Sequence, residues 1–400
     1  FTPVVTPDRH RAGILTHPYV LSAFSYHKQT SPIHRGVYLS RNVLGRFLKP
    51  PPKATEFKDS DFKPNQTMRE KVTELTKDHS CMACHEIINP IGFSLENYDA
   101  VGRFRTREKN KPITPEPDPM PEQLTSQQIR FYEKNGYLVI ENQIPDAWLA
   151  KIRAEIFRFE EEAAELEHSN DRLDLEDSHT RAAPRLRRIK LPHLISTLFH
   201  ELMLSDHILG PARDLIGPNL RLHTSKLNMK SAGYGAAVEW HQDYAFYPHT
   251  NDDILAIGVI IDDMKIENGP LMVYPGSQKG PVYDHHVEGV FAGAMLPEDN
   301  GLNANDAVPL TGPAGSISIH HGRMVHGSAL NTSERARRIL FYEMMAADAF
   351  PLMGSMTRWD GIEEYNTRML CGTPTLNPRL KDIPVRIPQP QPDVPISIYE

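Results

Sequence analysis

The chain has 400 residues, 24% of them charged, and a formal net charge of −7. That length allows two or three domains with cores of their own, and the small acidic excess gives no reason to expect a nucleic-acid partner. No apolar run approaches the roughly 18 residues that a membrane span needs. Three cysteines exclude a disulfide framework, and nothing in the sequence predicts an oligomeric state.

The segment CMACH at 81–85 has the C-x-x-C-H pattern of covalent haem attachment. The thiols of Cys81 and Cys84 would add to the haem vinyl groups, and His85 would be the proximal iron ligand. A zinc site is the alternative, but zinc needs a further ligand set, and the third cysteine, Cys371, lies far along the chain.

The flanks of this motif resemble a cytochrome-like domain of large secreted bacterial proteins. The run PIGFSLENYDAVGR at 90–103 carries the resemblance, which covers about residues 8–108. It implies a small, mainly α, cytochrome c-like domain over 1–109, the end of a longer parent domain, with haem c as its cofactor. Met68, Met82 and several histidines are all candidates for the distal ligand.

Proline-rich stretches predict where the domains end. The prolines of NKPITPEPDPMPE at 110–122 favour extended structure over helix or central strand. We therefore expect a linker at 110–122, a second domain over 123–350 and a C-terminal extension over 351–400.

Helix signals dominate the first part of the second domain. Thr125 and Gln128 have the spacing of a capping box, and Gly136 is a plausible helix stop. The run at 137–142 reads as a strand, and 146–167 reads as a helix because its apolar residues recur every three or four positions.

A second helix is expected at about 196–209. The charge-rich segment 158–188 is interpreted as a solvated helix and loop, with a lid or partner surface as the alternative.

Short β-like runs separated by turn residues follow. Helices followed by many short strands indicate an α+β unit built round a sandwich or barrel. The runs lie at 221–229, 253–261, 269–277, 315–321 and 338–345.

An H-x-D pair, His241 and Asp243, lies before the run at 253–261. In an extended backbone, residues two apart project to the same face, so an imidazole and a carboxylate can grip one cation. A lone H-x-D pair is more often a hydrogen-bonded surface pair. Here a group of histidines follows 79–85 residues later. Two histidines and one carboxylate bind one face of Fe(II) and leave three positions open.

Three blocks resemble, in order and spacing, the phytanoyl-CoA dioxygenase family of Fe(II)- and 2-oxoglutarate-dependent oxygenases over about 121–350. They are EWHQDYAFYPHTNDD at 239–253, ENGPLMVYPGSQKG at 267–280 and HGSALNTSERARR at 326–338. The resemblance implies a double-stranded β-helix (jelly roll) with flanking helices. Small-molecule substrate and O₂ would meet at the metal, and hydroxylation would release succinate and CO₂.

The resemblance also implies the site residues. Fe(II) would be bound by His241, Asp243 and His326, while Arg337 and Ser328 would hold the 2-oxoglutarate C5 carboxylate. An arginine suits this role because its planar fork pairs with a carboxylate.

Several assignments have alternatives. His320 and His321 compete for the third ligand position, but neither is followed by Ser and Arg at the family spacing. Asp243 favours hydroxylation, because related halogenating enzymes replace this carboxylate with a small residue. Some relatives have an aromatic residue near the keto acid where this chain has Val259.

Tyr244, Phe246 and Tyr247 either line the substrate pocket or are ordinary core aromatics. Lys226 and Lys230 either reach a carboxylate of substrate or cosubstrate or are surface lysines.

The sequence therefore predicts a hydroxylase of a small organic or lipid-like substrate. The alternative is a haem c electron-transfer protein whose jelly roll is a non-catalytic binding module. Because 2-oxoglutarate is a cytosolic metabolite, a cytoplasmic location is favoured for the oxygenase, and a periplasmic one if haem is attached. The cytochrome-like part is interpreted as an appended, vestigial fragment. Electron delivery to the iron and a gene boundary that joins two neighbouring proteins remain alternatives.

Overall fold

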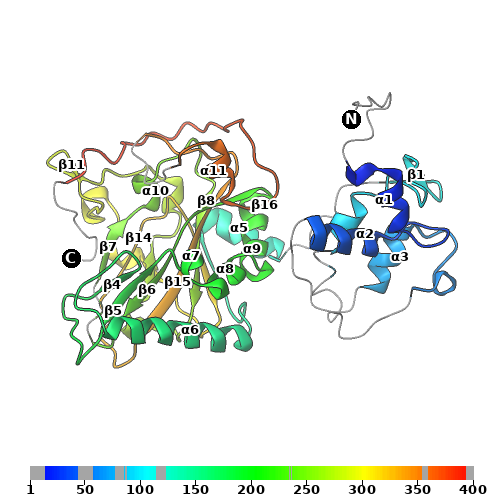
Figure 1. Cartoon of the computed structure of the whole chain (residues 1–400). Helices are drawn as coiled ribbons and strands as arrows, with labels where there is room; N and C mark the ends of the chain where they lie inside the picture. Colours follow the sequence, from blue (N-terminus) through cyan, green and yellow to red (C-terminus); the bar gives the residue numbers. More distant parts are fainter. Residues whose placement is uncertain are drawn as a thin grey trace. The chain divides into compact units, whose positions relative to one another are not determined.

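The computed structural model describes residues 14–43, 57–76, 85, 88–113, 123–233, 235, 237–353 and 359–392. The chain divides into two compact units, Phe1–Pro121 and Glu122–Glu400 (Figure 1). Most of the expected linker, 114–122, lies outside the described residues. No helix in the described ranges combines the length and the apolar character that crossing a membrane requires.

The first unit is built from short helices. Pro32 opens one of them behind the capping residue Ser31, and Thr67 and Glu70 form a capping box at another. Met68, a candidate haem ligand, packs in the small core with Val72 and Phe93. Cys81, Met82 and Cys84 lie outside the described residues. The elements are η1 (Ile14–Thr16), α1 (Pro18–Ala23), α2 (Pro32–Tyr38), η2 (Leu39–Val43), η3 (Asp59–Asp61), α3 (Met68–Leu75), β1 (Arg107–Glu108) and β2 (Lys111–Pro112), with a further helical stretch at 88–93.

A buried arginine ties this unit together. Arg35 on α2 is 1% exposed and donates hydrogen bonds to the carbonyls of Leu21, Tyr98 and Asp99, among others. Its guanidinium is 3.6 Å from the Glu96 carboxylate, which also accepts a 2.6 Å hydrogen bond from the Thr30 hydroxyl. Burial outweighs these partners and raises the pKa of Glu96 to about 7.

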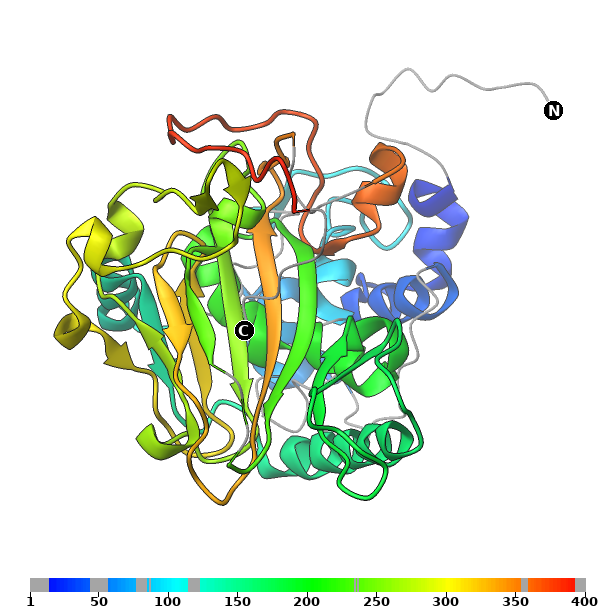
Figure 2. The same ribbon diagram turned by 90° about the vertical axis from the view of Figure 1, so that its left-hand side faces the viewer.

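The second unit contains two antiparallel sheets that enclose a cavity. Figure 2 shows the long strand β15 in orange, between green strands of the larger sheet. The larger sheet runs β3 (Tyr137–Ile140), β13 (Ile317–His321), β8 (Ile254–Ile260), β15 (Arg337–Ala346), β6 (Leu220–Lys230), β5 (Leu186–Lys190) and β4 (Leu173–Leu175), with β16 (Met369–Cys371) also paired to β6. The smaller sheet runs β12 (Val308–Pro309), β9 (Leu271–Val273), β14 (His326–Ser328) and β7 (Val238–His241). Two facing sheets form the predicted double-stranded β-helix.

Helices cover the outer face of the larger sheet. The predicted helix at 125–135 is confirmed: Thr125 and Gln128 form the capping box, and Gly136 ends the helix in the left-handed region at φ 79°. The expected helix at 196–209 is instead two helices, which meet at Ser205. The helices are α5 (Ser126–Asn135), α6 (Asp146–Ala164), α7 (Pro192–Ile195), α8 (Thr197–Met203) and α9 (Asp206–Ile216).

Strand alternation separates the core from the cavity. On β15, Leu340 and Tyr342 pack in the large core with the apolar face of α6. Their neighbours Phe341 and Glu343 line the cavity on the other face. The side chains that matter for chemistry are therefore placed by the same pattern that buries the core.

The C-terminal segment packs on this unit. Tyr365 on α11 (Ile362–Asn366) is fully buried, and Arg379 and Lys381 form ion pairs with Asp253. The short strands β10 (His286–Val287) and β11 (Val290–Phe291) form a separate hairpin. Short 3₁₀ turns occur at η4 (Ile266–Asn268), η5 (Ser277–Lys279), η6 (Glu298–Asn300) and η7 (Ala304–Asp306).

The buried Glu96 makes the first unit sensitive to pH. Its folded pKa of about 7 exceeds the ordinary glutamate pKa of 4.5, so between these two pH values the folded chain holds a proton that the unfolded chain releases. We expect this unit to lose about 3 kcal/mol of stability as the pH rises from 4.5 to 7.5. Hydrogen exchange of peptides from 14–43 and 88–104, corrected for intrinsic rates, measures this loss. The Glu96→Gln variant should show little of it, and an equal loss in that variant would contradict the assignment.

Candidate metal centre

His241 and Asp243 lie at the end of β7 and the start of the short helix α10 (Asp243–Phe246). The sequence predicted both residues on an extended backbone. His241 is extended on β7 and Gln242 is extended after it (φ −121°, ψ 124°), but Asp243 already begins the helix α10. Gln242 points the other way and donates hydrogen bonds to the carbonyls of Pro281 and Arg323. Locking Gln242 turns its two neighbours to the same side, where each is 4% exposed.

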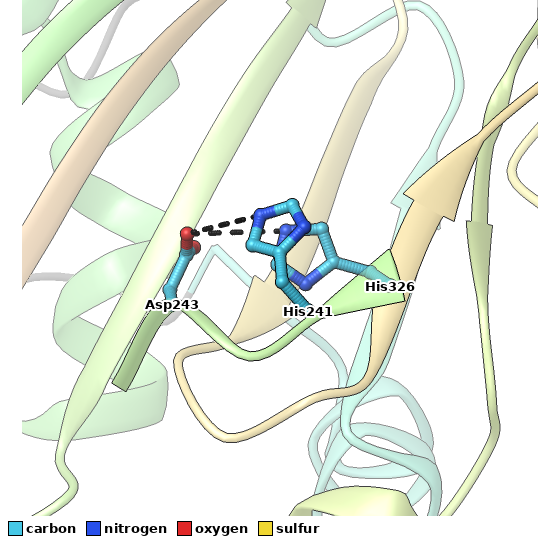
Figure 3. A group of neighbouring side chains, drawn as sticks. All are labelled: His241, Asp243 and His326. Carbon is cyan, nitrogen blue, oxygen red and sulfur yellow. Dashed lines mark ion pairs between the residues drawn. The ribbon is translucent and has the colours of Figure 1, made fainter. Parts of the chain in front are cut away.

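His326 reaches the same point from β14, which pairs with β7 so that His326 lies opposite His241. The Asp243 Oδ1 atom is 3.8 Å from Nε2 of His241 and 3.9 Å from Nε2 of His326. One ligand atom from each residue lies within 4.8 Å of the others. Figure 3 shows the three side chains converging from different elements.

Hydrogen bonds orient both imidazoles for metal binding. The Nδ1 atom of His241 is 2.7 Å from the Glu239 carbonyl, and that of His326 is 2.9 Å from the Met324 carbonyl. A carbonyl can only accept, so Nδ1 carries the proton and Nε2 presents its lone pair towards Asp243. Burial lowers the pKa of both histidines, which keeps them neutral. Two neutral imidazoles and one carboxylate fit a divalent cation.

The two histidines of β13 that were alternatives for the third metal ligand are neighbours on the strand, so their side chains point to opposite faces. His320 faces the centre, with Nε2 at 3.4 Å from Asp243 Oδ2. His321 faces away, accepts a hydrogen bond from the Arg323 amide and lies beside the Tyr132 ring. The structure therefore brings a third imidazole to Asp243, and it is His320.

The cavity between the sheets is small, about 60 Å³. At one end lie Arg337 and Lys230, both 4% exposed, in directly paired positions on β15 and β6. Lys230 donates a 2.8 Å hydrogen bond to the Ser328 hydroxyl and another to the Ala329 carbonyl. Burial and the neighbouring charge of Arg337 lower the pKa of Lys230 to about 6. Arg337 and Lys230 thus lie together at the base of the cavity, where Lys230 loses its proton more readily than an exposed lysine does.

Tyr244, Phe246 and Tyr247 lie around the centre, but none lines the cavity described here. Tyr244 is buried in a separate core cluster and donates a hydrogen bond to the His249 carbonyl. Phe246 packs its edge on the His241 ring, with centroids 5.7 Å apart. Burial and then the nearby charges of Asp243 and Glu343 raise the pKa of Tyr247.

Further cavity residues were not singled out from the sequence. Glu343 on β15 forms a 2.7 Å ion pair with Lys226 on β6. Glu176 and Arg187 come from the segment interpreted as a solvated helix and loop, which in fact contains β4 and β5. The sequence signal that could have predicted strand β4 is the alternation of the apolar residues Leu173 and Leu175 before a turn-rich stretch.

Val259 does not face the keto-acid region. It is fully buried on the core side of β8, and its neighbour Gly258 is on the other face. A Cβ on Gly258 would lie 2.7 Å from Ile339 and 2.8 Å from both Phe341 and Ser318. An aromatic residue would not fit there.

In the first unit, His85 is partly buried and its Nδ1 lies 2.9 Å from the Asn89 amide oxygen. The Asn89 amide nitrogen in turn donates to the Thr76 hydroxyl at 2.9 Å. These hydrogen bonds orient the His85 ring with Nδ1 as donor, which leaves Nε2 unprotonated.

Comparisons with known proteins agree with this geometry. Residues 132–339 match the model of the phytanoyl-CoA dioxygenase (PhyH) family, and residues 11–108 match a family described as a protein of unknown function. The second match assigns no activity to the first unit.

Two curated relatives are similar to most of the second unit. A probable alpha-ketoglutarate-dependent hypophosphite dioxygenase of Stutzerimonas stutzeri is 38% identical over 271 residues, 67% of this chain and 93% of the relative. An L-proline trans-4-hydroxylase of Streptomyces griseoviridis is 30% identical over 229 residues, 52% of this chain and 82% of the relative. The apo crystal structure of EctD from S. alaskensis superposes with a TM-score of 0.51 at 22% identity, covering 60% of this chain and 84% of that one, and shows a shared fold.

Metal titrations distinguish the ligands. We expect His326→Gln to weaken Co(II) binding at least 100-fold, because it removes a neutral imidazole from the centre. His321→Gln, the matched control on β13, should bind as the wild type does. Calorimetry under anaerobic conditions measures both. Equal loss in the two variants would point to a general structural effect and contradict the ligand set.

Proposed function

The chain belongs to the phytanoyl-CoA dioxygenase family, and on that premise we propose which of its residues carry the reaction. It is an iron- and 2-oxoglutarate-dependent dioxygenase. The observation that carries the site assignment is the convergence of two neutral imidazoles and a carboxylate within 4.8 Å, in a cavity that is also lined by the buried basic side chains of Arg337 and Lys230.

His241, Asp243 and His326 bind the iron. Bound Fe(II) supplies the activation of O₂ that accompanies oxidative decarboxylation of 2-oxoglutarate. The carbonyls of Glu239 and Met324 hold the two imidazoles in the tautomer that can ligate. The surrounding burial excludes water.

Arg337, Lys230 and Ser328 hold the C5 carboxylate of 2-oxoglutarate. The guanidinium offers a planar fork, the ammonium a second charge and the hydroxyl a third donor. Gly269 fixes the guanidinium by accepting a 3.0 Å hydrogen bond from it. Burial and the charge of Arg337 lower the pKa of Lys230 to about 6, so a dianionic cosubstrate would keep both side chains charged at neutral pH.

The substrate is a small molecule whose reacting hydrogen is replaced by hydroxyl. The small cavity supports this size, and the relatives named above act, by their names, on hypophosphite and L-proline. Phe246 packs against the His241 ring and Tyr247 lies in the same core cluster, so we infer that both support the metal ligands from outside the cavity.

Cosubstrate binding should depend on pH through Lys230. Its pKa of about 6 in the empty site means that 2-oxoglutarate binding requires proton uptake at higher pH. We expect the Kd for 2-oxoglutarate to rise as the pH increases from 6 to 8. The Lys230→Met variant should bind 2-oxoglutarate about 10-fold more weakly than the wild type at pH 6. Its Kd should change little between pH 6 and pH 8. Titration of the visible charge-transfer band of the anaerobic Fe(II) complex measures each Kd.

Succinate formation provides the activity control. The wild type should form succinate from 2-oxoglutarate only with Fe(II) and O₂, and Asp243→Ala should form none. The exposed-site variant Asp284→Ala should retain activity. Turnover by Asp243→Ala at the wild-type rate would contradict the iron ligand set.

A second function is favoured by the hydrogen bonds of His85. We infer that CMACH would attach haem c through Cys81 and Cys84, and that Nε2 of His85 would hold its iron. Asn89 and Thr76 support this by fixing the ring with Nε2 available. The first unit would then transfer electrons.

Haem attachment is tested by coexpression with a c-type haem maturation system. We expect haem that survives acid–acetone extraction, and its loss in Cys81→Ser/Cys84→Ser. Asn89→Leu should keep the covalent haem but loosen His85, which would shift the ferric spectrum towards high spin. Haem-free wild-type protein from that system would contradict the inference.

A further inference from the structure

The cavity has a second cationic position, Lys226, on the same face of β6 as Lys230. Four residues of extended strand separate the two lysines by roughly 13 Å. Lys226 pairs in register with Phe341, whose ring centroid is 5.8 Å from the ammonium. The two lysines therefore lie in different parts of the cavity. The cosubstrate carboxylate can contact Lys230, but it leaves Lys226 without an assigned role.

Lys226 lies close to the metal ligands. It lines the same cavity as His241, Asp243 and His326. Its ion-pair partner Glu343 lines this cavity as well. The Lys226–Glu343 pair and the carboxylate of the metal centre thus face the same small cavity.

The pair is asymmetric. The Glu343 side chain is 2% exposed and the Lys226 side chain is 30% exposed. The carboxylate is therefore a buried anchor that holds the ammonium at the more open side of the cavity. An ammonium has three donors, so Lys226 can contact a further anion while it keeps its bond to Glu343.

The charges around the cavity accept such an anion. Four cationic side chains and three carboxylates line it. Iron adds two positive charges and 2-oxoglutarate two negative ones, which leaves one positive charge in excess. A negatively charged group on the substrate would therefore enter a cavity whose net charge is positive, so it would not be repelled. The cations are Arg187, Lys226, Lys230 and Arg337, and the carboxylates are Glu176, Asp243 and Glu343.

We propose that Lys226, anchored by Glu343, binds the substrate of this dioxygenase, and that this substrate is a small molecule with an oxyanion group. The group is a carboxylate or a phosphorus oxyanion. This inference rests on the proposed function. Held by Lys226, the anion places the rest of a small substrate beside the metal ligands, and Lys226 sets specificity without touching 2-oxoglutarate.

The test adds oxyanion probes to the anaerobic wild-type complex with Fe(II) and 2-oxoglutarate. Hypophosphite, phosphite, L-proline and ectoine are the probes, and L-prolinamide is the control without an oxyanion. We expect at least one oxyanion probe to shift the charge-transfer band and, with O₂, to stimulate 2-oxoglutarate consumption. The responding probe distinguishes a phosphorus oxyanion from a carboxylate. No response to any of them, or an equal response to L-prolinamide, would overturn the substrate class.

Variants then test the residue. Lys226→Met should weaken binding of the responding probe about 10- to 100-fold. The Kd of this variant for 2-oxoglutarate should stay within twofold of the wild-type value, which also shows that the variant folds. Lys226→Arg should recover part of the loss. The matched control is Lys190→Met, which removes the lysine paired opposite Lys226 on β5, where it forms an ion pair with Asp174.

Two results separate the possible failures. An unchanged probe affinity in Lys226→Met would overturn the role of Lys226. A wild type that develops no charge-transfer band with Fe(II) and 2-oxoglutarate would instead refute the proposed function.

Discussion

The second unit depends on one buried carboxylate. Among the described residues, Asp243 is within ion-pair distance only of histidines: His241, His320 and His326. Burying an ionised carboxylate beside the neutral imidazoles of His241 and His326 costs free energy that a bound divalent cation offsets. The pairing of β7 with β14 and the inward position of His320 on β13 both bring imidazoles to this point. The rest of the site is arranged around the metal that this cluster requires.

The second organising feature is the register between β6 and β15. Their inward side chains meet as pairs, with Lys230 opposite Arg337 and Lys226 opposite Phe341. Because alternate residues face the cavity, one strand pair supplies both the cosubstrate end and the Lys226 end. The residues between them on β15, such as Leu340, hold the sheet to its helices. The same alternation thus serves stability and chemistry together.

Local signals carried much of the prediction, and non-local pairing set its limits. The capping box at Thr125 and the periodic face of α6 depend on neighbours in the chain, so their helices were predictable. Glu176 and Arg187 reach the cavity only because β5 pairs with β6, and charge-rich sequence gave no sign of that pairing. Val259 was expected near the keto acid, but its side chain faces the core. A shift of one residue along a strand moves a side chain to the other face of the sheet. The ligand set and the haem motif came from resemblance and spacing, and their roles remain proposals.

Iron-edge anomalous diffraction tests the account most directly. Crystals of the full chain grown anaerobically with Fe(II) and 2-oxoglutarate should contain one peak bonded to His241 Nε2, His326 Nε2 and an Asp243 oxygen. The distal carboxylate of 2-oxoglutarate should lie against Arg337. A peak bonded through His320 instead of His326, or no peak at Asp243 at saturating iron, would contradict the central claim.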